Sequence, residues 1–440
     1  MAAGTWSTAN KVRPGVYINF ETEPKPLGGV ADRGITTIPV VLPWGSSKNV
    51  ITVEAGEDVY TKLGYSLTSP ELLLIREALK RAKKALIYRV NTGTQATAMI
   101  GDLTVTALHG GIRGNDIIVV VEKNIDDEQK YDITTIIAGT VADTQTVASI
   151  AELIDNDWVT FSGTEEAALQ ESAGIRLSGG ANGTVTNQDY LDYLSAIETH
   201  SFDTIALPVT DPTLKSVFVS FVKRMREDEG KKVQCVLENY PLADYEGVIS
   251  VKNGVVLADG TELTPVQATA WVAGATAGAN VDQSLTYQTY DDAVDVIPRY
   301  TNTQIIEALQ AGELVFTTND SKVIVEQDIN TLTSFTPSHG KAFSKNRVVR
   351  VLDNINNSFV QIFSDFYIGK INNDEDGHNL LKGECIHYME TLQSMNAIQN
   401  FDPQTDLIIL PGNDADSVFC TVYVQPTDSV EKLYFKVQVR

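Results

Sequence analysis

The end of the chain carries the pattern that most restricts its fold. Residues 432–440 read Lys-Leu-Tyr-Phe-Lys-Val-Gln-Val-Arg, and the apolar side chains of Leu433, Phe435, Val437 and Val439 occupy every second position. Alternation with a period of two predicts a β-strand that is buried on one face. Chain ends usually fray unless a sheet holds them, so we expect this strand to pair with its own domain or with a neighbouring molecule.

The beginning of the chain has a similar pattern. Residues 14–20 read Pro-Gly-Val-Tyr-Ile-Asn-Phe, in which Val16, Ile18 and Phe20 share one face of an extended segment. We therefore predict an extended N-terminal arm over residues 1–20. Two extended ends that are able to join a sheet favour a subunit that links itself into a lattice.

The composition limits the class of protein. With 440 residues and 43% hydrophobic residues, the chain is typical of a soluble protein of about three domains. The net charge of −23 opposes binding to a phosphate backbone, so no nucleic-acid partner is expected.

No apolar run approaches the roughly 18 residues of a membrane helix, and the first residues lack the pattern of a signal peptide. We expect no insertion into a membrane. The three widely spaced cysteines fit reduced core residues of a protein made in a cytoplasm.

Changes of pattern along the chain predict a multidomain α/β protein. Residues 21–96 form an N-terminal α/β segment, in which a helix begins after Ser69-Pro70. Residues 97–180 contain short alternating strands between Gly, Asn and Asp turns, which predicts an inserted β-sandwich. The glycine-rich residues 178–183 that follow are interpreted as a flexible joint.

The second half of the chain predicts two further units. In residues 184–335 amphipathic helices alternate with continuous apolar strands, which indicates a parallel sheet covered on both faces. The small side chains of residues 268–279 predict a helix that lies very close to its neighbour. Residues 340–440 predict an α+β C-terminal domain with two helices around a hydrophilic loop at 372–378. Short strands follow, and the domain ends in the extended strand at 430–440.

Several segments, in this order, make the sequence similar to a known family. They are residues 14–20, residues 271–280 (Trp-Val-Ala-Gly-Ala-Thr-Ala-Gly-Ala-Asn), residues 284–287 (Ser-Leu-Thr-Tyr), residues 347–353 (Arg-Val-Val-Arg-Val-Leu-Asp) and the basic and aromatic final strand. Over essentially its whole length, the chain resembles the contractile tail sheath proteins of phages and phage-tail-like particles, especially those of Gram-positive hosts.

This resemblance implies both a fold and a function. The implied fold combines a subtilisin-like α/β domain, an inserted β-sandwich and a C-terminal domain that faces an inner tube, with termini that pair with sheets of neighbouring subunits. The implied function is that of a non-enzymatic subunit without a cofactor, which polymerises as stacked rings around a tube and contracts to drive the tube through a cell envelope. The expected partners are further copies of the chain, the tail tube protein, and baseplate and tail terminator proteins. The expected location is a virion tail or tail-like particle assembled in the cytoplasm of a bacterial host.

Two other functions are compatible with such a domain, namely a hydrolase and a non-catalytic α/β ligand-binding protein. Ser338-His339-Gly340 is the best fragment for a hydrolase, but adjacency in sequence does not make a catalytic triad, and we interpret these residues as a loop. The glycines of residues 179–183 could cradle a phosphate at a helix start. They lack the Lys-Ser/Thr of a P-loop, which favours a domain joint.

The histidines show no spacing typical of metal ligands. They are His109, His200, His339, His378 and His387. The acidic residues 374–376 precede His378, which is compatible with a calcium or transition-metal site. A solvated acidic turn is favoured, and no metal site is predicted.

One basic cluster contrasts with the acidic background. Residues 341–350 carry four positive charges and no negative one. They could be a solvated helix start, although positive charge at that end opposes the helix macrodipole. They could equally be a docking surface for an acidic tail tube, with Lys345, Arg347 and Arg350 facing it. The sequence leaves both interpretations open.

Overall fold

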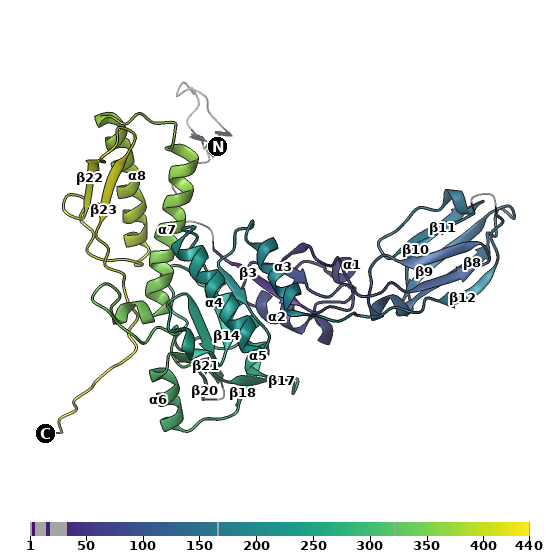
Figure 1. The fold of residues 1–440 in the computed structure, drawn as a ribbon, viewed down its shortest axis with the longest axis horizontal. Helices are drawn as coiled ribbons and strands as arrows, with labels where there is room; N and C mark the ends of the chain where they lie inside the picture. The colour runs from purple at the N-terminus through teal and green to yellow at the C-terminus, as the bar shows by residue number, and fades with distance from the viewer. Residues whose placement is uncertain (1, 5–14, 18–32, 165–166, 321, 440) are drawn as a thin grey trace.

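A seven-stranded sheet forms the middle of the molecule, and the other parts extend from it (Figure 1). The structure is a computed structural model that describes residues 2–4, 15–17, 33–164, 167–320 and 322–439. All neighbouring strands of the sheet are parallel except β4, which runs antiparallel to β5 at one edge. In spatial order, the strands are β19 (Glu313–Leu314), β15 (Val248–Val251), β14 (Gln234–Glu238), β13 (Thr204–Ala206), β3 (Ile35–Val40), β5 (Lys84–Arg89) and β4 (Val50–Glu54).

This sheet joins two segments of the chain that the insertion separates. β3 pairs with β13, with Thr36 opposite Thr204. From the sequence, residues 21–96 and 184–335 are expected as two units, but their described residues form a single unit, called here the α/β body. A periodic pattern identifies each strand but does not show which distant strand it pairs with, because that pairing is a tertiary contact.

Helices cover both faces of the sheet. α2 (Leu73–Leu79) and α5 (Pro265–Gly278) pack on one face, and α3 (Asn187–Ile197) and α4 (Pro212–Glu227) pack on the other. Along β14, Val236 belongs to the apolar cluster with α5, whereas Cys235 and Leu237 belong to the cluster with α3 and α4. This alternation confirms the predicted parallel sheet with both faces buried.

Two glycines allow α5 to lie directly against α2. A Cβ atom at Gly274 would lie 2.1 Å from the carbonyl oxygen of Ala78, and one at Gly278 would lie 1.9 Å from that of Arg81. Both distances are far below van der Waals contact, so any side chain at these positions would push the two segments apart. The predicted close approach of this small-residue helix is confirmed.

The predicted β-sandwich lies at one end of the molecule (Figure 1). Two sheets enclose a core that includes Val105, Val119, Ile133 and Val159, all at most 1% exposed. The first sheet contains, in spatial order, β10 (Thr140–Val147), β9 (Tyr131–Ile137), β8 (Ile117–Lys123) and β12 (Ser172–Arg176). The second contains β11 (Val159–Gly163), β7 (Leu103–Ala107) and β6 (Thr97–Ile100).

Smaller elements complete the α/β body. They are the helices α1 (Tyr60–Leu63) and α6 (Asn302–Gln310), a sheet of β17 (Glu262–Leu263), β16 (Gly254–Leu257) and β18 (Ala293–Ile297), and a hairpin of β20 (Phe316–Asn319) and β21 (Lys322–Val325). Among the residues that the structure describes, no helix is long and apolar enough to cross a membrane.

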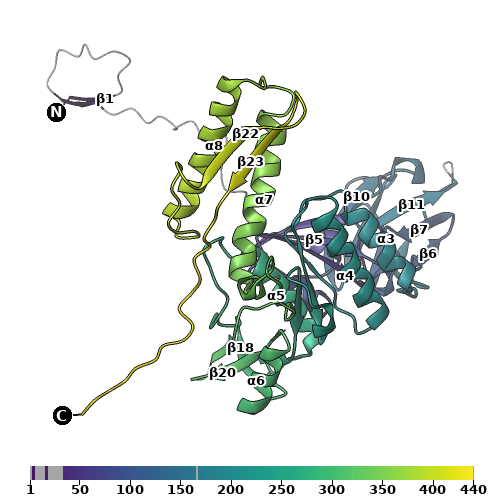
Figure 2. The same ribbon diagram turned by 60° about the vertical axis from the view of Figure 1, so that its left-hand side comes forward.

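The C-terminal domain lies at the other end of the molecule (Figure 2). It contains the helices α7 (Asn346–Phe366) and α8 (Glu375–Ser394) and a hairpin of β22 (Leu407–Pro411) and β23 (Val418–Val422). Leu407 of the hairpin and Tyr388 of α8 share one core. The loop predicted at 372–378 is shorter than expected, because the Asp374 side chain accepts a 2.9 Å hydrogen bond from the backbone N–H of Gly377 and so starts α8 earlier.

Candidate assembly surfaces

The C-terminal arm, defined here as residues 432–439, extends away from the rest of the molecule (Figures 1 and 2). None of its residues belongs to a strand. The four alternating apolar side chains are 70–95% exposed, from Leu433 to Val439 with Phe435 and Val437 between them. Among the described residues, the predicted strand therefore joins no sheet of its own chain, and pairing with a neighbouring molecule stays a prediction.

The N-terminal arm is described only in part. Strand β1 (Ala2–Gly4) pairs in parallel with β2 (Gly15–Tyr17), which places Val16 opposite Ala3. Ile18 and Phe20 lie outside the described residues. The linking role predicted for these three positions therefore stays a prediction.

The hairpin of β22 and β23 offers an edge to which a strand could be added. Within the described ranges, these two strands pair only with each other. One face packs on α8, with Leu407 only 2% exposed. The other face carries Leu410 and Phe419, which are 52% and 62% exposed. Unpaired edges together with exposed apolar side chains are typical of a sheet that accepts another strand.

Arg350 does not occupy the surface position that the basic cluster suggests. It is fully buried, with Nη2 3.4 Å from the carboxylate of Asp328 and Nη1 donating to the carbonyl oxygen of Gln283. Burial lowers the pKa of Arg350, while the carboxylate of Asp328 acts in the opposite direction. The tube-facing prediction is wrong for Arg350, because α7 turns this side chain into the body. Arg347, in the first turn of the helix, is half-buried.

Lys345 is also turned toward its own chain, at the base of the C-terminal arm. Its Nζ atom forms an ion pair with Glu431 and lies 3.7 Å from the carboxylate of Asp428. Glu431 also accepts hydrogen bonds from Nε2 of Gln327 at 2.7 Å and from Oγ1 of Thr286 at 2.8 Å. The interpretation of Lys345 as a cation that faces the tube is therefore corrected. Sequence reasoning missed Glu431, because no local pattern links residues 86 positions apart.

The pKa of Glu431 reflects these contacts. Partial burial acts to raise it, but the donors from Lys345, Gln327 and Thr286 outweigh that effect and hold the pKa below its ordinary value. The carboxylate is therefore charged at neutral pH, which favours its ion pair with Lys345.

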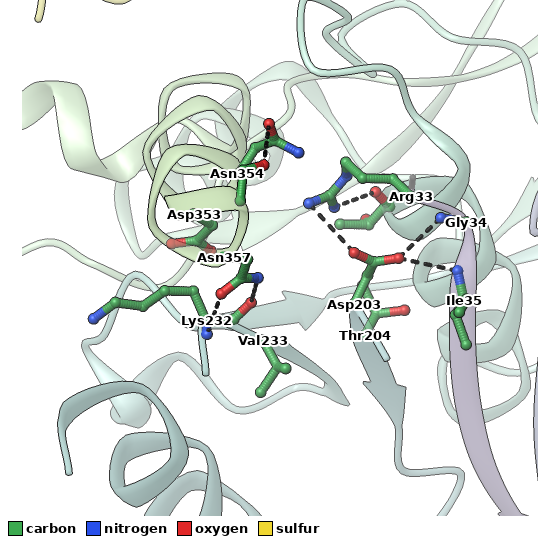
Figure 3. A network of polar contacts seen from close by, with 12 residues as sticks. Arg33, Gly34, Ile35, Asp203, Thr204, Lys232, Val233, Asp353, Asn354 and Asn357 are labelled. Carbon is green, nitrogen blue, oxygen red and sulfur yellow. Dashed lines mark hydrogen bonds and ion pairs between the residues drawn. The ribbon is translucent and has the colours of Figure 1, made fainter. Parts of the chain in front are cut away.

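Polar side chains of α7 attach the C-terminal domain to the α/β body (Figure 3). The side chain of Asn357 accepts a hydrogen bond from the backbone N–H of Lys232 and donates one to its carbonyl oxygen, both at 2.9 Å. Nearby, Arg226 of α4 donates two hydrogen bonds, of 2.6 and 2.8 Å, to the carboxylate of Asp353. Both charged side chains are less than a tenth exposed. A buried two-point contact of this kind holds α7 in one orientation.

Comparison with known proteins gives the family of the chain. Models of phage tail sheath proteins match residues 33–90 (tail sheath protein Gp18 domain III N-terminal region), 91–182 (β-sandwich domain), 183–331 (central domain) and 338–440 (C-terminal domain). The phage-like element PBSX protein XkdK of Bacillus subtilis (strain 168) is 42% identical over 466 residues, which cover 100% of both chains. The chain belongs to the phage tail sheath family. The resemblance to tail sheath proteins that the sequence analysis identified is confirmed.

Solved sheath structures have the same architecture. The sheath tail protein from Desulfitobacterium hafniense is 61% identical, with a TM-score of 0.86 over 97% of this chain and 100% of that one. The helical sheath of the anti-feeding prophage (AFP) in its contracted state is only 13% identical, with a TM-score of 0.55 over 97% of this chain and 98% of that one. The second similarity concerns the fold alone.

The junction between the body and the β-sandwich of this sheath protein is held by hydrogen bonds. The two connecting segments run side by side, with the N–H of Thr94 donating to the carbonyl oxygen of Ala181 at 2.7 Å and the reverse bond at 3.2 Å. The buried guanidinium of Arg89 donates to the carbonyl oxygens of Gly45 and Gly110, each at 2.6 Å. Burial lowers the pKa of Arg89 to about 10. The expectation of a flexible joint is corrected, because these contacts fix both connecting segments.

Residues 338–340, considered for catalysis, lie in a surface turn of the sheath protein, whereas Glu375, Asp376 and His378, considered for a metal site, lie in the first turn of α8. Ser338 Oγ lies 3.2 Å from Oγ1 of Thr336, and the ring of His339 packs against Phe343 with centroids 4.8 Å apart. In the part of the chain that the structure describes, no group of three His, Cys, Asp or Glu side chains is arranged to hold a metal ion. These contacts bring no nucleophile and base together.

Proposed function

We propose that this sheath protein polymerises as stacked rings around an inner tube and contracts to drive the tube through a cell envelope. The observation that carries the proposal is the C-terminal arm, an extended segment (Figure 1) in which the four alternating apolar side chains are exposed. A soluble chain that presents such a segment has a surface suited to another copy of itself. The shared fold with a helical sheath in a contracted state supports the contraction step.

We propose that the arm adds a strand to the hairpin of β22 and β23 in a neighbouring copy. The hairpin has free edges, and its exposed Leu410 and Phe419 could cover the apolar face of the incoming strand. The N-terminal arm, with Val16, Ile18 and Phe20, would join a neighbouring sheet in the same way. Each subunit would then both donate and receive strands.

The energetics favour this pairing in a polymer rather than in a free chain. Burying four apolar side chains contributes about 6–12 kcal/mol, at about 1.5–3 kcal/mol each. Ordering the nine residues 432–440 costs about 9–18 kcal/mol, at about 1–2 kcal/mol each. Ladder hydrogen bonds of about 0.5–1.5 kcal/mol apiece bring the sum close to zero. Pairing is then decided by whether the accepting sheet is already held in place by other subunits, which makes assembly cooperative.

The remaining partners follow from the same proposal. They are the tail tube, the baseplate and tail terminator proteins, and the particle would be a virion tail or tail-like particle assembled in a bacterial cytoplasm. Arg347, which is half-buried in the first turn of α7, is the candidate that remains for contact with the tube. We further infer that the α/β body is subtilisin-like in fold without catalysis, since its parallel sheet is covered by helices on both faces. No contact among the described residues favours a hydrolase or a ligand-binding protein.

Truncation tests the linking role. Removing residues 432–440 should leave a folded monomer that no longer forms tubes in negative-stain electron microscopy, because the donated strand is lost. A matched pair of full-length variants separates the two faces of the arm. Changing Leu433, Phe435, Val437 and Val439 to Ser should abolish tubes, whereas changing Lys432, Lys436 and Gln438 to Ser should retain them. Ordered tubes formed by the truncated chain would contradict the proposal.

A further inference from the structure

The contacts of Glu431 set the point at which the C-terminal arm becomes free. Its side chain is 10% exposed, while every residue of the arm that follows is exposed. Both of its carboxylate oxygens are engaged, Oε1 by Thr286 and Oε2 by Gln327 and Lys345. A charged group with this set of donors is anchored, in contrast to the exposed side chains on either side of it.

The donors come from two parts of the molecule. Thr286 and Gln327 belong to the α/β body. Along the chain, Thr286 precedes β18 and Gln327 follows β21. Lys345 directly precedes α7 of the C-terminal domain. The backbone N–H of Asp328 in turn donates to Oγ1 of Thr286 at 3.0 Å, which positions that hydroxyl. Glu431 therefore ties the arm to the boundary between body and C-terminal domain rather than to the hairpin from which the chain has come.

The segment before Glu431 has a separate attachment. The N–H of Thr427 donates to the carbonyl oxygen of Ala397 at 2.9 Å, and that of Gln399 donates to the carbonyl oxygen of Gln425 at 3.0 Å. Between Thr427 and the arm, the structure shows two residues that link the segment to the rest of the chain. Glu431 does so through its carboxylate, and Asp428 through its contact with Lys345. Opening the contacts of Glu431 together with the Asp428–Lys345 ion pair would therefore free the chain from residue 428 onward.

We propose that Glu431, Lys345, Gln327 and Thr286 form a clasp that fixes the origin and reach of the linking arm. At about 3.3 Å per residue, the segment 432–439 spans about 26 Å, whereas 428–439 would span about 40 Å. A closed clasp thus limits a donated strand to copies whose hairpin lies within the shorter distance. This consequence in the sheath rests on the proposed linking role, but the clasp itself is a property of the single chain.

Limited proteolysis of the unpolymerised full-length chain tests the clasp. A glutamyl endopeptidase should release the peptide 432–440 slowly from the wild type. The protease can bind the chain around the peptide bond after Glu431 only when the clasp opens. Lys345→Met removes the charged donor and should speed this release about tenfold, since cleavage follows the population of the open form. Gln327→Leu removes one neutral donor and should give a smaller increase in the same direction.

Two controls keep the test decisive. Lys341→Met removes an exposed lysine of the same basic cluster and should leave the release rate unchanged. Tryptic cleavage after Lys436, which lies in the free arm, should be fast and equal in all variants.

Should Lys345→Met disturb folding, Gln327→Leu alone decides the result. Release after Glu431 as fast as cleavage after Lys436 in the wild type, or unchanged in both variants, would overturn the clasp. Tubes formed without residues 432–440 would instead contradict the linking role and leave the clasp untouched.

Discussion

The β-sandwich junction and the C-terminal arm both leave the α/β body, but they are held in opposite ways. At the junction, Arg89 is buried among backbone carbonyl groups and Thr94 exchanges hydrogen bonds with Ala181. Beyond the clasp at Glu431, the arm has exposed side chains and belongs to no strand. The glycine-rich connection is the fixed one, and the connection rich in strand-forming residues is the free one.

This difference shows that local composition does not decide rigidity. Glycines at the junction allow two chain segments to approach each other closely enough to exchange backbone hydrogen bonds, and those bonds hold them. The arm has good strand-forming residues but pairs with no strand in the part of the chain that the structure describes, and a strand without a ladder gains little from its propensity. We therefore expect substitutions at the junction to change stability and substitutions in the arm to change assembly.

The largest effect is expected at Gly111, in the junction. Its φ is +139°, and a Cβ atom there would lie 2.0 Å from the carbonyl oxygen of Pro43. Gly111→Ala should lower the free energy of unfolding by about 4 kcal/mol, with strain and overlap each contributing about 2 kcal/mol. Gly179→Ala is the matched control, because its φ is +86° but nothing lies within 4 Å of the added Cβ. It should cost only about 1–2 kcal/mol. Equal losses in urea unfolding would show that the junction is not tightly packed.

A smaller effect is expected at Arg89. Arg89→Met keeps the length of the side chain but leaves the carbonyl oxygens of Gly45 and Gly110 without their donor. We expect a loss of about 2 kcal/mol in urea unfolding, since an unsatisfied buried acceptor costs about 1–3 kcal/mol. Arg176→Met serves as the control, because this arginine is 64% exposed and lies 3.8 Å from Asp116. It should change stability by less than about 1 kcal/mol. A similar change in both variants would contradict the role given to Arg89.

The smallest effect on stability is expected in the arm. Replacing Leu433, Phe435, Val437 and Val439 by Ser removes apolar side chains that are already exposed in the single chain. The free energy of unfolding of the unpolymerised chain, measured in urea, should therefore stay within about 0.5 kcal/mol of the wild type, even though tube formation is expected to be lost. A clear loss of monomer stability would mean that the arm packs on its own body, and the contrast with the junction would then disappear.

Most elements of the fold could be predicted from the sequence, because each has a local cause. Asp211-Pro212 begins α4, where the Asp211 side chain accepts a 2.7 Å hydrogen bond from the backbone N–H of Thr213. The small residues of α5 predicted its contact with a neighbouring helix, which Gly274 and Gly278 make possible. The alternating segments predicted the β-sandwich and the hairpin of the C-terminal domain. Spacing and side-chain size are properties of a short stretch of chain, so the sequence shows them directly.

The assembly surfaces could be predicted less completely. The alternation in residues 432–440 places four apolar side chains at every second position, but it does not say whether a sheet of the same chain covers them. The cluster at 341–350 shows where positive charge gathers, but it does not show where each side chain points. Arg350 and Lys345 were grouped by charge, yet one is buried beside Asp328 and the other holds Glu431.

The sequence by itself determined which segments become helices and strands, which ends of the chain can join a sheet, and the family to which the chain belongs. Only the tertiary structure decided that β3 lies beside β13, that the glycine-rich joint is bonded and that Glu431 anchors the arm. The physical reason is the range of the interactions. Periodicity and capping act within a few residues, whereas the partner of a buried charge or an edge strand is set by which distant segments the folded chain brings together.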